Sequence, residues 1–104
     1  MKIVAVTACP TGIAHTYMAA EALENAAKKL GHKIKVETQG SIGIENKISQ
    51  KEANEAELVI FAADVAVKEE SRFKDKPIYK VEAQKAIKNA KAVVEEAIKL
   101  VENK

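Results

Sequence analysis

Two short apolar runs, at residues 2–8 and 58–63, constrain the fold of this chain more than any other feature. Both are rich in aliphatic and β-branched residues, which is typical of strands buried on both faces of a parallel sheet. A third segment, 33–39, alternates polar and apolar residues and predicts a strand with one exposed face. A fourth, 77–81, opens on a proline, which suits a strand at the edge of a sheet.

Helical patterns separate these strands. Residues 17–30 carry apolar side chains at helical spacing and end before Gly31, a typical position for a C-cap glycine. Ser49 and Glu52 form a capping-box pattern that predicts a short helix over about 49–56. Residues 65–75 show no clear pattern beyond a helical turn near 69–74. From Ala83 onward, an apolar stripe opposite Lys and Glu predicts one amphipathic helix packed on the sheet.

This alternation predicts a single α/β domain over residues 1–104, with a doubly wound, four-stranded parallel sheet. We expect strand order 2-1-3-4 and helices on both faces. Ligands of such sheets bind beyond the carboxyl ends of the strands, at the switch point between the first and third strands. Cys9 follows the first strand there, and Gln39 to Gly43, Asp64 and Glu82 follow the others. Asp64 can contact a ligand at this edge or cap a turn.

Composition excludes several classes of function. Lys and Arg total 17 against 15 acidic residues, the lysines are spread along the chain, and aromatic residues are few, so we expect no nucleic-acid partner. One cysteine and two separated histidines predict neither an internal disulfide nor a metal site. The apolar N-terminal stretch is too short for a signal peptide or a membrane span. We therefore expect a cytoplasmic protein whose thiol stays reduced.

Residues 7–16, Thr-Ala-Cys-Pro-Thr-Gly-Ile-Ala-His-Thr, predict an oxyanion-binding loop. The small and hydroxyl residues after Cys9 let backbone N–H groups approach a ligand, and the following helix directs its positive end toward it. To lower the pKa of a thiol from about 8.5 to about 6.5, the surroundings must stabilise the thiolate over the thiol by about 2.7 kcal/mol. A helix N-terminus and one or two N–H bonds supply that amount. A phosphoryl group on the sulfur suits the same donors, although a small buried thiol is the alternative interpretation of Cys9.

Other polar residues of the loop leave two interpretations open. His15 stands six residues after Cys9, where a cysteine phosphatase places its arginine, and it either contacts a phosphoryl group or only orders the loop. Thr11 and Thr16 can each donate a hydroxyl, but Thr16 also suits a helix cap. Arg72, the one arginine of the sequence, is expected in a surface ion pair.

The stretch from Thr7 to Ala20 resembles the enzyme IIB component of the bacterial phosphotransferase system, in its fructose-type branch. Residues 36–43 (VETQGSIG), 63–64 and 72–73 also resemble that family. The resemblance implies that Cys9 accepts a phosphoryl group from a phosphohistidine of enzyme IIA. It then implies transfer to fructose or a related hexose held by the membrane-embedded enzyme IIC.

The resemblance also implies a phosphate-binding loop, no cofactor, and a monomer that meets the inner face of the membrane only through enzyme IIC. The residues of that loop are Pro10, Thr11, Gly12, Ile13, Ala14, His15 and Thr16. From the topology we expect Gln39, Gly40 and Asp64 to border the rim of the site. One alternative is a low-molecular-weight-type phosphatase, but the chain lacks the arginine of its loop and an Asp-Pro pair to supply a general acid. The other alternative is a regulatory domain whose phosphorylation is sensed by a partner.

Overall fold

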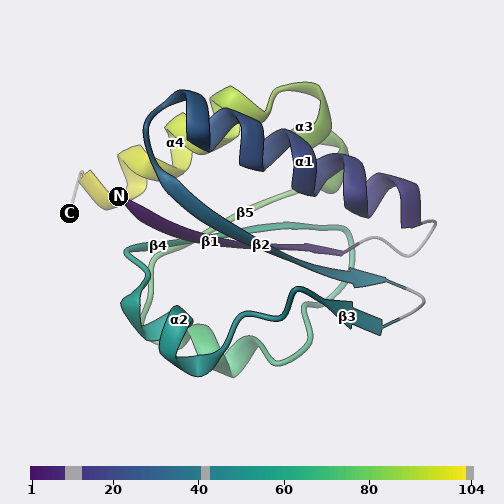
Figure 1. Cartoon of the computed structure of the whole chain (residues 1–104), viewed down its shortest axis with the longest axis horizontal. Coiled ribbons are helices and arrows are strands. Elements are labelled where there is room, and N and C mark those ends of the chain that lie inside the picture. The colour runs from purple at the N-terminus through teal and green to yellow at the C-terminus, as the bar shows by residue number, and fades with distance from the viewer. Residues whose placement is uncertain (9–12, 41–42, 103–104) are drawn as a thin grey trace.

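The computed structural model describes residues 1–8, 13–40 and 43–102 and has the predicted α/β class (Figure 1). Its five strands lie in the order β3-β2-β1-β4-β5. The strands are β1 (Lys2–Ala8), β2 (Lys33–Gly40), β3 (Gly43–Glu45), β4 (Leu58–Ala63) and β5 (Ile78–Val81). The helices are α1 (Ile13–Lys29), α2 (Gln50–Glu55), α3 (Ala83–Lys88) and α4 (Ala90–Glu102), with a short 3-10 helix, η1 (Glu70–Phe73).

The sheet is mixed, so the prediction of four strands that are all parallel is wrong. β1 pairs in parallel with β2 and β4, and β4 with β5, but β3 pairs antiparallel with β2. Gly40 and Gly43 are partners across this hairpin, and Gly43 has a φ of +111°, a conformation that glycine adopts without steric cost. A strand of three residues carries too little periodicity to be recognised in the sequence.

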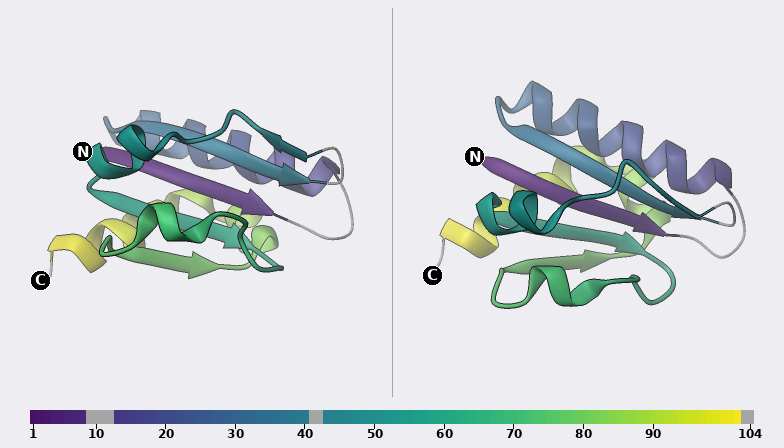
Figure 2. Two further views of the ribbon diagram at one scale, coloured as in Figure 1. Left: turned by 90° about the horizontal axis from the view of Figure 1, so that it is seen from below. Right: turned by 60° about the horizontal axis from the view of Figure 1, so that its bottom comes forward.

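Helices cover both faces of the sheet, as expected (Figures 1 and 2). α1, α3 and α4 pack on one face, while α2 and η1 lie on the other. Along β1, Ile3 and Ala5 join the core under α1, and Val4 and Val6 join the core on the face of α2. Because successive side chains of a strand point to opposite faces, a strand between two cores needs apolar residues at successive positions, as the sequence pattern of β1 predicted.

The C-terminal segment forms two helices, so the prediction of one continuous helix from Ala83 is wrong. Asn89 has φ −149° and ψ 60°. Its N–H donates to the carbonyl of Lys85 (2.9 Å), and its own carbonyl accepts from the N–H of Val93 (3.1 Å). Asn89 thus closes α3 and opens α4. Asparagine disfavours helix interiors because its side chain competes for nearby backbone groups.

α2 begins with the predicted capping box. The N–H of Glu52 donates to Ser49 Oγ (3.1 Å), and the N–H of Ser49 donates to Glu52 Oε1 (2.9 Å). Lys35 of β2 also binds the Glu52 carboxylate, at 2.7 and 2.9 Å. The hydrogen bonds from Lys35 and Ser49 hold the pKa of Glu52 at about 2. The cap therefore fixes α2 to the sheet as well as starting the helix.

α1 is longer than the sequence pattern indicated. It begins at Ile13, four residues before the start of the predicted range, and ends at Lys29, near the predicted end. In the ranges that the structure describes, no helix combines the length and apolar content needed to span a bilayer.

Replacing Ser49 tests the capping box. Ser49→Ala removes the side-chain acceptor of the first turn of α2 and is expected to lower the free energy of unfolding by about 1 kcal/mol. Urea denaturation measures this change. Lys51→Ala, an exposed substitution in the same helix, is the control and should stay within about 0.5 kcal/mol of the parent protein. Equal losses in the two variants would contradict a role for the cap.

Candidate functional site

The carboxyl ends of β1, β2 and β4 meet at one edge of the sheet (Figure 2). Ala8, the last residue of β1, is in register with Gln39 of β2 and Ala63 of β4. The N–H of Asp64 donates to the carbonyl of Ala8 (2.9 Å). The residue that covalently precedes Cys9 is therefore held between the ends of two neighbouring strands.

The four residues between β1 and α1, Cys9, Pro10, Thr11 and Gly12, lie outside the described residues. For Ile13, Ala14 and His15 the structure describes the backbone, which forms the first turn of α1, but not the side chains. The first N–H groups of a helix have no partner within it, and the helix dipole adds a partial positive charge at this end. The backbone of α1 therefore begins beside the edge with donors suited to an anion.

Thr16 lies within the first turn of α1 and not before it, so it is not the residue that caps the helix. It is buried, and its carbonyl accepts a hydrogen bond from Thr7 Oγ1 of β1 (3.1 Å). This bond joins the start of α1 to the end of β1, on either side of the segment that contains Cys9.

A buried polar network lies beneath the same edge, on the face covered by η1. Glu37 of β2 is fully buried, and Arg72 of η1 donates to both of its carboxylate oxygens, at 2.6 and 2.9 Å. The N–H of Ile48 (2.7 Å) and the side-chain amide of Gln39 (2.7 Å) donate to the same carboxylate. Each oxygen of Glu37 thus accepts two hydrogen bonds, which compensates much of the cost of burying its charge.

Arg72 is buried, so the prediction of a surface ion pair is wrong. Besides binding Glu37, it donates to the carbonyls of Ile48 (2.6 Å), Glu69 (2.9 Å) and Lys68 (3.3 Å), and its guanidinium lies 4.8 Å from the centre of the Phe73 ring. The sequence offered one signal for this pair, a glutamate within a strand pattern, but that pattern assigned polar residues to an exposed face.

The prediction that β2 has one exposed face is wrong for its second half. In β2, residues 36–39 are all buried. Val36 belongs to the core on the side of α1, and η1 and the loop before it cover the opposite face, on which Glu37 and Gln39 lie. Burial disfavours the charged form of Glu37, but the hydrogen bonds from Arg72, Gln39 and Ile48 outweigh it and hold the pKa of Glu37 below its ordinary value. The hydrogen bond to Glu37 in turn raises the pKa of Arg72.

The predicted rim residues have different roles. Gln39 lies at the edge by its backbone, but its side-chain amide pairs with the backbone of Lys68 and does not face outward. Asp64 is exposed, and its Oδ1 accepts the N–H of Ala83 (3.2 Å) at the start of α3, which is the capping role that the sequence left open. Gly40 forms the hairpin with β3. Glu82 precedes α3 without a side-chain capping bond.

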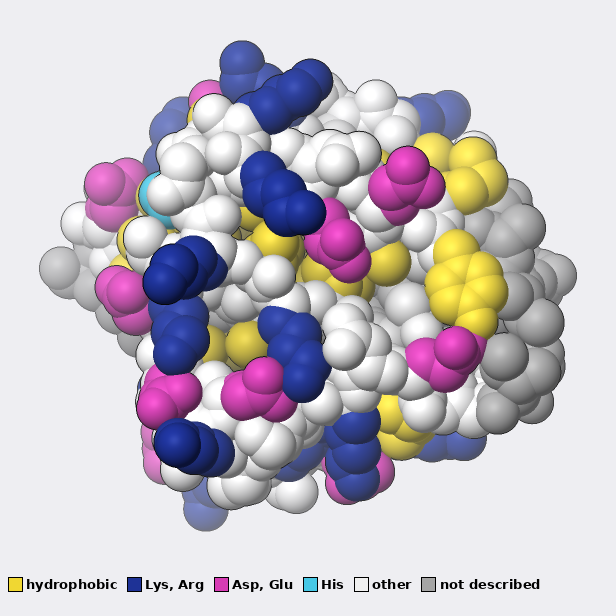
Figure 3. Space-filling model, viewed as in Figure 1, with side chains coloured by type: hydrophobic (Ala, Val, Ile, Leu, Met, Phe, Trp, Pro, Cys, Tyr) yellow, Lys and Arg dark blue, Asp and Glu magenta, His cyan; other side chains and the backbone are white. Residues whose placement is uncertain are grey.

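Apolar side chains are exposed near this edge. Tyr17 and Met18 of α1 are 39% and 50% exposed, and Val65, just after β4, is 43% exposed. Tyr17 donates its hydroxyl to Glu45 of β3. In Figure 3, apolar surface is visible toward the right-hand end, where α1 begins, and the foremost lysine side chains lie mainly in the left half. The edge therefore offers apolar surface next to polar groups.

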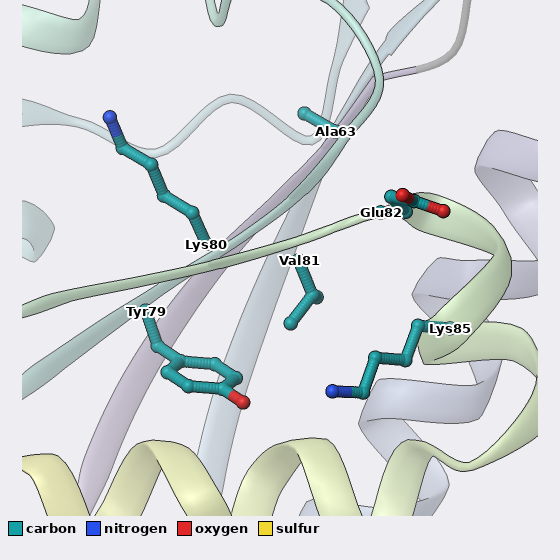
Figure 4. A pocket seen from close by; sticks show the side chains of 6 residues that line it. All are labelled: Ala63, Tyr79, Lys80, Val81, Glu82 and Lys85. Carbon is teal, nitrogen blue, oxygen red and sulfur yellow. The ribbon is translucent and has the colours of Figure 1, made fainter.

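A shallow hollow of about 490 Å³ lies between the end of β5 and α3 (Figure 4). Its lining includes Tyr79 and Lys85, whose side chains both approach Glu96: the Tyr79 hydroxyl donates to the carboxylate, and Lys85 Nζ lies 3.7 Å from it. Two of the polar groups of this hollow are therefore already paired with Glu96. The lining also includes Ala63, which is in register with Ala8, so the hollow adjoins the edge where β1 ends.

Comparison with known proteins decides the family. A family model described as the lactose/cellobiose-specific IIB subunit of the PTS, the phosphotransferase system, matches residues 4–96. This chain belongs to the PTS IIB family. It is 54% identical over 93 residues to the PTS fructose-like EIIB component 2 of Escherichia coli K12, covering 89% of this chain and 88% of that protein.

Two other PTS relatives extend the comparison. The chain is 50% identical over 98 residues to the 2-O-alpha-mannosyl-D-glycerate-specific EIIABC component of E. coli K12, covering 94% of this chain but 15% of that protein. A crystal structure of a domain of the fructose-specific IIABC component of Borrelia burgdorferi superposes with a TM-score of 0.89 at 53% identity, covering 94% of this chain and 93% of that one. The resemblance to IIB components is confirmed, while the sugar names of the relatives differ.

In this IIB protein, Glu37→Gln is expected to destabilise the fold by about 3–5 kcal/mol, because it keeps the shape of the side chain but leaves Arg72 buried without an opposite charge. Urea denaturation at neutral pH measures the loss. The matched control is Glu55→Gln, which breaks the exposed pair of Glu55 with Lys2 (3.0 Å) and should cost far less. Similar losses for the two variants would contradict a stabilising buried network.

The same pair predicts a pH dependence. Because the pKa of Glu37 in the folded protein is below its ordinary value of 4.5, its contribution is complete above that value and is lost as the pH falls below it. Unfolding free energies measured from about pH 7 to about pH 3 should therefore fall more steeply for the parent protein than for Glu37→Gln. Other carboxylates with lowered pKa, such as Glu52, leave some slope in both proteins. Parallel curves would refute the assignment to Glu37.

Proposed function

We propose that this chain is a phosphoryl carrier in which Cys9 accepts a phosphoryl group from a phosphohistidine of enzyme IIA. It then transfers the group to fructose, or a related hexose, bound by the membrane protein enzyme IIC. The observation that carries the proposal is the place of the cysteine in the sequence of a PTS IIB chain: it directly follows Ala8, which lies between the ends of β2 and β4, and it precedes the start of α1 by four positions.

Two displacements at phosphorus make up the reaction. In the first, the Cys9 thiolate attacks phosphorus, the S–P bond forms, and the P–N bond breaks with its electron pair returning to the ring nitrogen, which takes up a proton from water. In the second, a sugar hydroxyl oxygen attacks, the S–P bond breaks with its electron pair remaining on sulfur, and the hydroxyl proton passes to a base or to water. Both transfers place negative charge on the phosphoryl oxygens, which N–H donors stabilise.

Residues 10–16 are proposed to form the loop that holds the phosphoryl group, with the N–H donors supplied by residues 11–16 because Pro10 has no N–H. The backbone N–H groups at the start of α1 and the positive end of its dipole favour both the thiolate and the phosphoryl group. Within the loop, the Thr11 hydroxyl is a further donor, and His15 is assigned either to the phosphoryl group or to ordering the loop. Gln39, Gly40 and Asp64 border this site through their backbone positions.

A carrier is favoured over a phosphatase by the position of the only arginine of the sequence. A cysteine phosphatase needs a guanidinium on the phosphate oxygens, but all three nitrogens of Arg72 donate within the protein, to Glu37 and to backbone carbonyls. Without such an arginine and a general acid, a thiophosphate intermediate breaks down slowly and persists until the acceptor arrives. A long-lived intermediate is what a carrier requires.

The sugar is assigned less directly than the chemistry. The names of the related proteins include fructose-like, 2-O-alpha-mannosyl-D-glycerate and lactose/cellobiose systems. Enzyme IIC binds the sugar, so the partner and not this chain is expected to decide specificity. We propose fructose or a related hexose, and a cytoplasmic monomer that reaches the membrane through enzyme IIC.

Mass spectrometry tests the phosphocysteine. After incubation with phosphorylated enzyme IIA, the intact chain should gain one phosphoryl group, and the modified peptide should contain Cys9. Unphosphorylated enzyme IIA and the Cys9→Ser variant are the controls, and neither should yield a phosphorylated thiol. Modification only at another residue would refute the proposal.

Two further assays separate the alternatives. Rapid turnover of a simple aryl phosphate would favour a phosphatase. With a competent enzyme IIC and sugar, the phosphoryl group should leave Cys9 and appear on the sugar. Its retention on the protein would favour a regulatory domain.

A further inference from the structure

Residues 64–69, which follow β4, form an exposed segment at the edge where β1 ends; we refer to it as the rim segment. Val65, Ala66, Lys68 and Glu69 are exposed, whereas Val67 is buried in the apolar core on the side of α2 and η1. The rim segment therefore has an anchored middle and an exposed apolar residue, Val65, beside the strand that leads to Cys9.

The side chain of Gln39 holds the rim segment in the way that a neighbouring strand would. The N–H of Lys68 donates to Gln39 Oε1 (2.8 Å), and Gln39 Nε2 donates to the carbonyl of Lys68 (3.0 Å). Gln39 Nε2 also donates to Glu37 (2.7 Å), which fixes the orientation of the amide. One side chain thus binds both backbone groups of Lys68.

Two other contacts complete this attachment. Arg72 donates to the carbonyls of Lys68 (3.3 Å) and Glu69 (2.9 Å). At the other end, the N–H of Asp64 donates to the carbonyl of Ala8 (2.9 Å). The rim segment is consequently fixed at both ends, and one end is bonded to the residue that precedes Cys9.

We propose that Gln39 is a positioning residue for phosphoryl transfer, which holds the rim segment in the conformation that enzyme IIA contacts when it docks. This inference rests on the proposed function of Cys9 and adds a residue that does not touch the phosphoryl group. The donor histidine must reach Cys9 directly, so the donor surface meets the edge next to Ala8. There the rim segment presents exposed apolar Val65 among charged neighbours, a composition suited to a protein partner.

Loss of the Gln39 attachment has a defined kinetic consequence. Without this attachment, the rim segment samples several conformations, and enzyme IIA binds only the one that fits its surface. The apparent affinity for enzyme IIA therefore falls in proportion to the fraction of molecules in that conformation. In this proposal, the transfer to Cys9 within the complex uses the loop of residues 10–16, whereas the described side-chain bonds of Gln39 go to Glu37 and Lys68. The half-saturating concentration of phosphorylated enzyme IIA should therefore rise while the maximal rate stays nearly constant.

Gln39→Met tests this inference, because methionine has a similar length but no amide. We expect the half-saturating concentration of phosphorylated enzyme IIA to rise about tenfold, with the maximal rate of Cys9 phosphorylation within about twofold of the parent protein. The control is Gln50→Met at the start of α2, away from this edge (Figure 1). Gln50 also donates to a backbone carbonyl, that of Arg72 (3.0 Å), and its loss should leave both kinetic values unchanged.

Two measurements keep the test decisive. Hydrogen exchange of the Lys68 amide should be faster in Gln39→Met than in the parent protein, and this readout needs no enzyme IIA. Val65→Ser, an exposed change outside the buried network, should by itself raise the half-saturating concentration. If Gln39 acts through the rim segment, the double variant should show less than the product of the two single effects.

The outcomes separate this inference from the proposed function. No phosphorylation of the parent protein at Cys9 would refute the proposed function. Normal phosphorylation of the parent protein, with unchanged half-saturating concentrations in folded Gln39→Met and in Val65→Ser, would refute the role of Gln39 alone. A fall in maximal rate without a change in half-saturating concentration would also refute it, because it would assign Gln39 to the reacting loop.

Discussion

The ion pair of Glu37 and Arg72 is the interaction on which the arrangement around this edge depends. Burying both charges is costly, and the structure compensates by giving each carboxylate oxygen two donors and by directing the remaining guanidinium donors to backbone carbonyls. In the described part of the chain, no buried side-chain polar atom lacks a hydrogen-bond partner. β2, η1, the loop at Ile48 and the residues after β4 are therefore held by one network.

This network also bears on the chemistry. The protein uses its one arginine to build the edge of the sheet and not to bind phosphate there, which suits a chain that passes a phosphoryl group on instead of hydrolysing it. The parallel strands bring Gln39 and Asp64 to either side of Ala8, and the Thr7 bond to Thr16 joins β1 to α1. The segment with Cys9 thus begins and ends at fixed points.

The sequence was sufficient for features that depend on local pattern. The apolar run of β1, the capping box at Ser49 and the glycine after α1 each predicted an element that the structure contains. The sequence was insufficient where contacts with distant residues determine whether a side chain is buried. The local pattern predicted that Glu37 is exposed, because its partner, Arg72, lies 35 positions away in the sequence. Strand β3 is too short to show a periodic pattern. The position of Gln39 was predictable from topology, but the direction of its side chain depended on that same distant segment.

Amide spectra of the ¹⁵N-labelled protein before and after phosphorylation test whether the phosphoryl group is carried at the carboxyl edge of the sheet. If it is, the largest chemical-shift changes should fall on the end of β1, the first turn of α1, and the neighbouring positions Gln39, Gly40 and Asp64. Amides at the opposite edge, such as Lys33 and Glu57, should hardly move, since they lie at or just before the beginnings of β2 and β4. Changes concentrated at that opposite edge would show that the phosphoryl group is not carried beside Ala8.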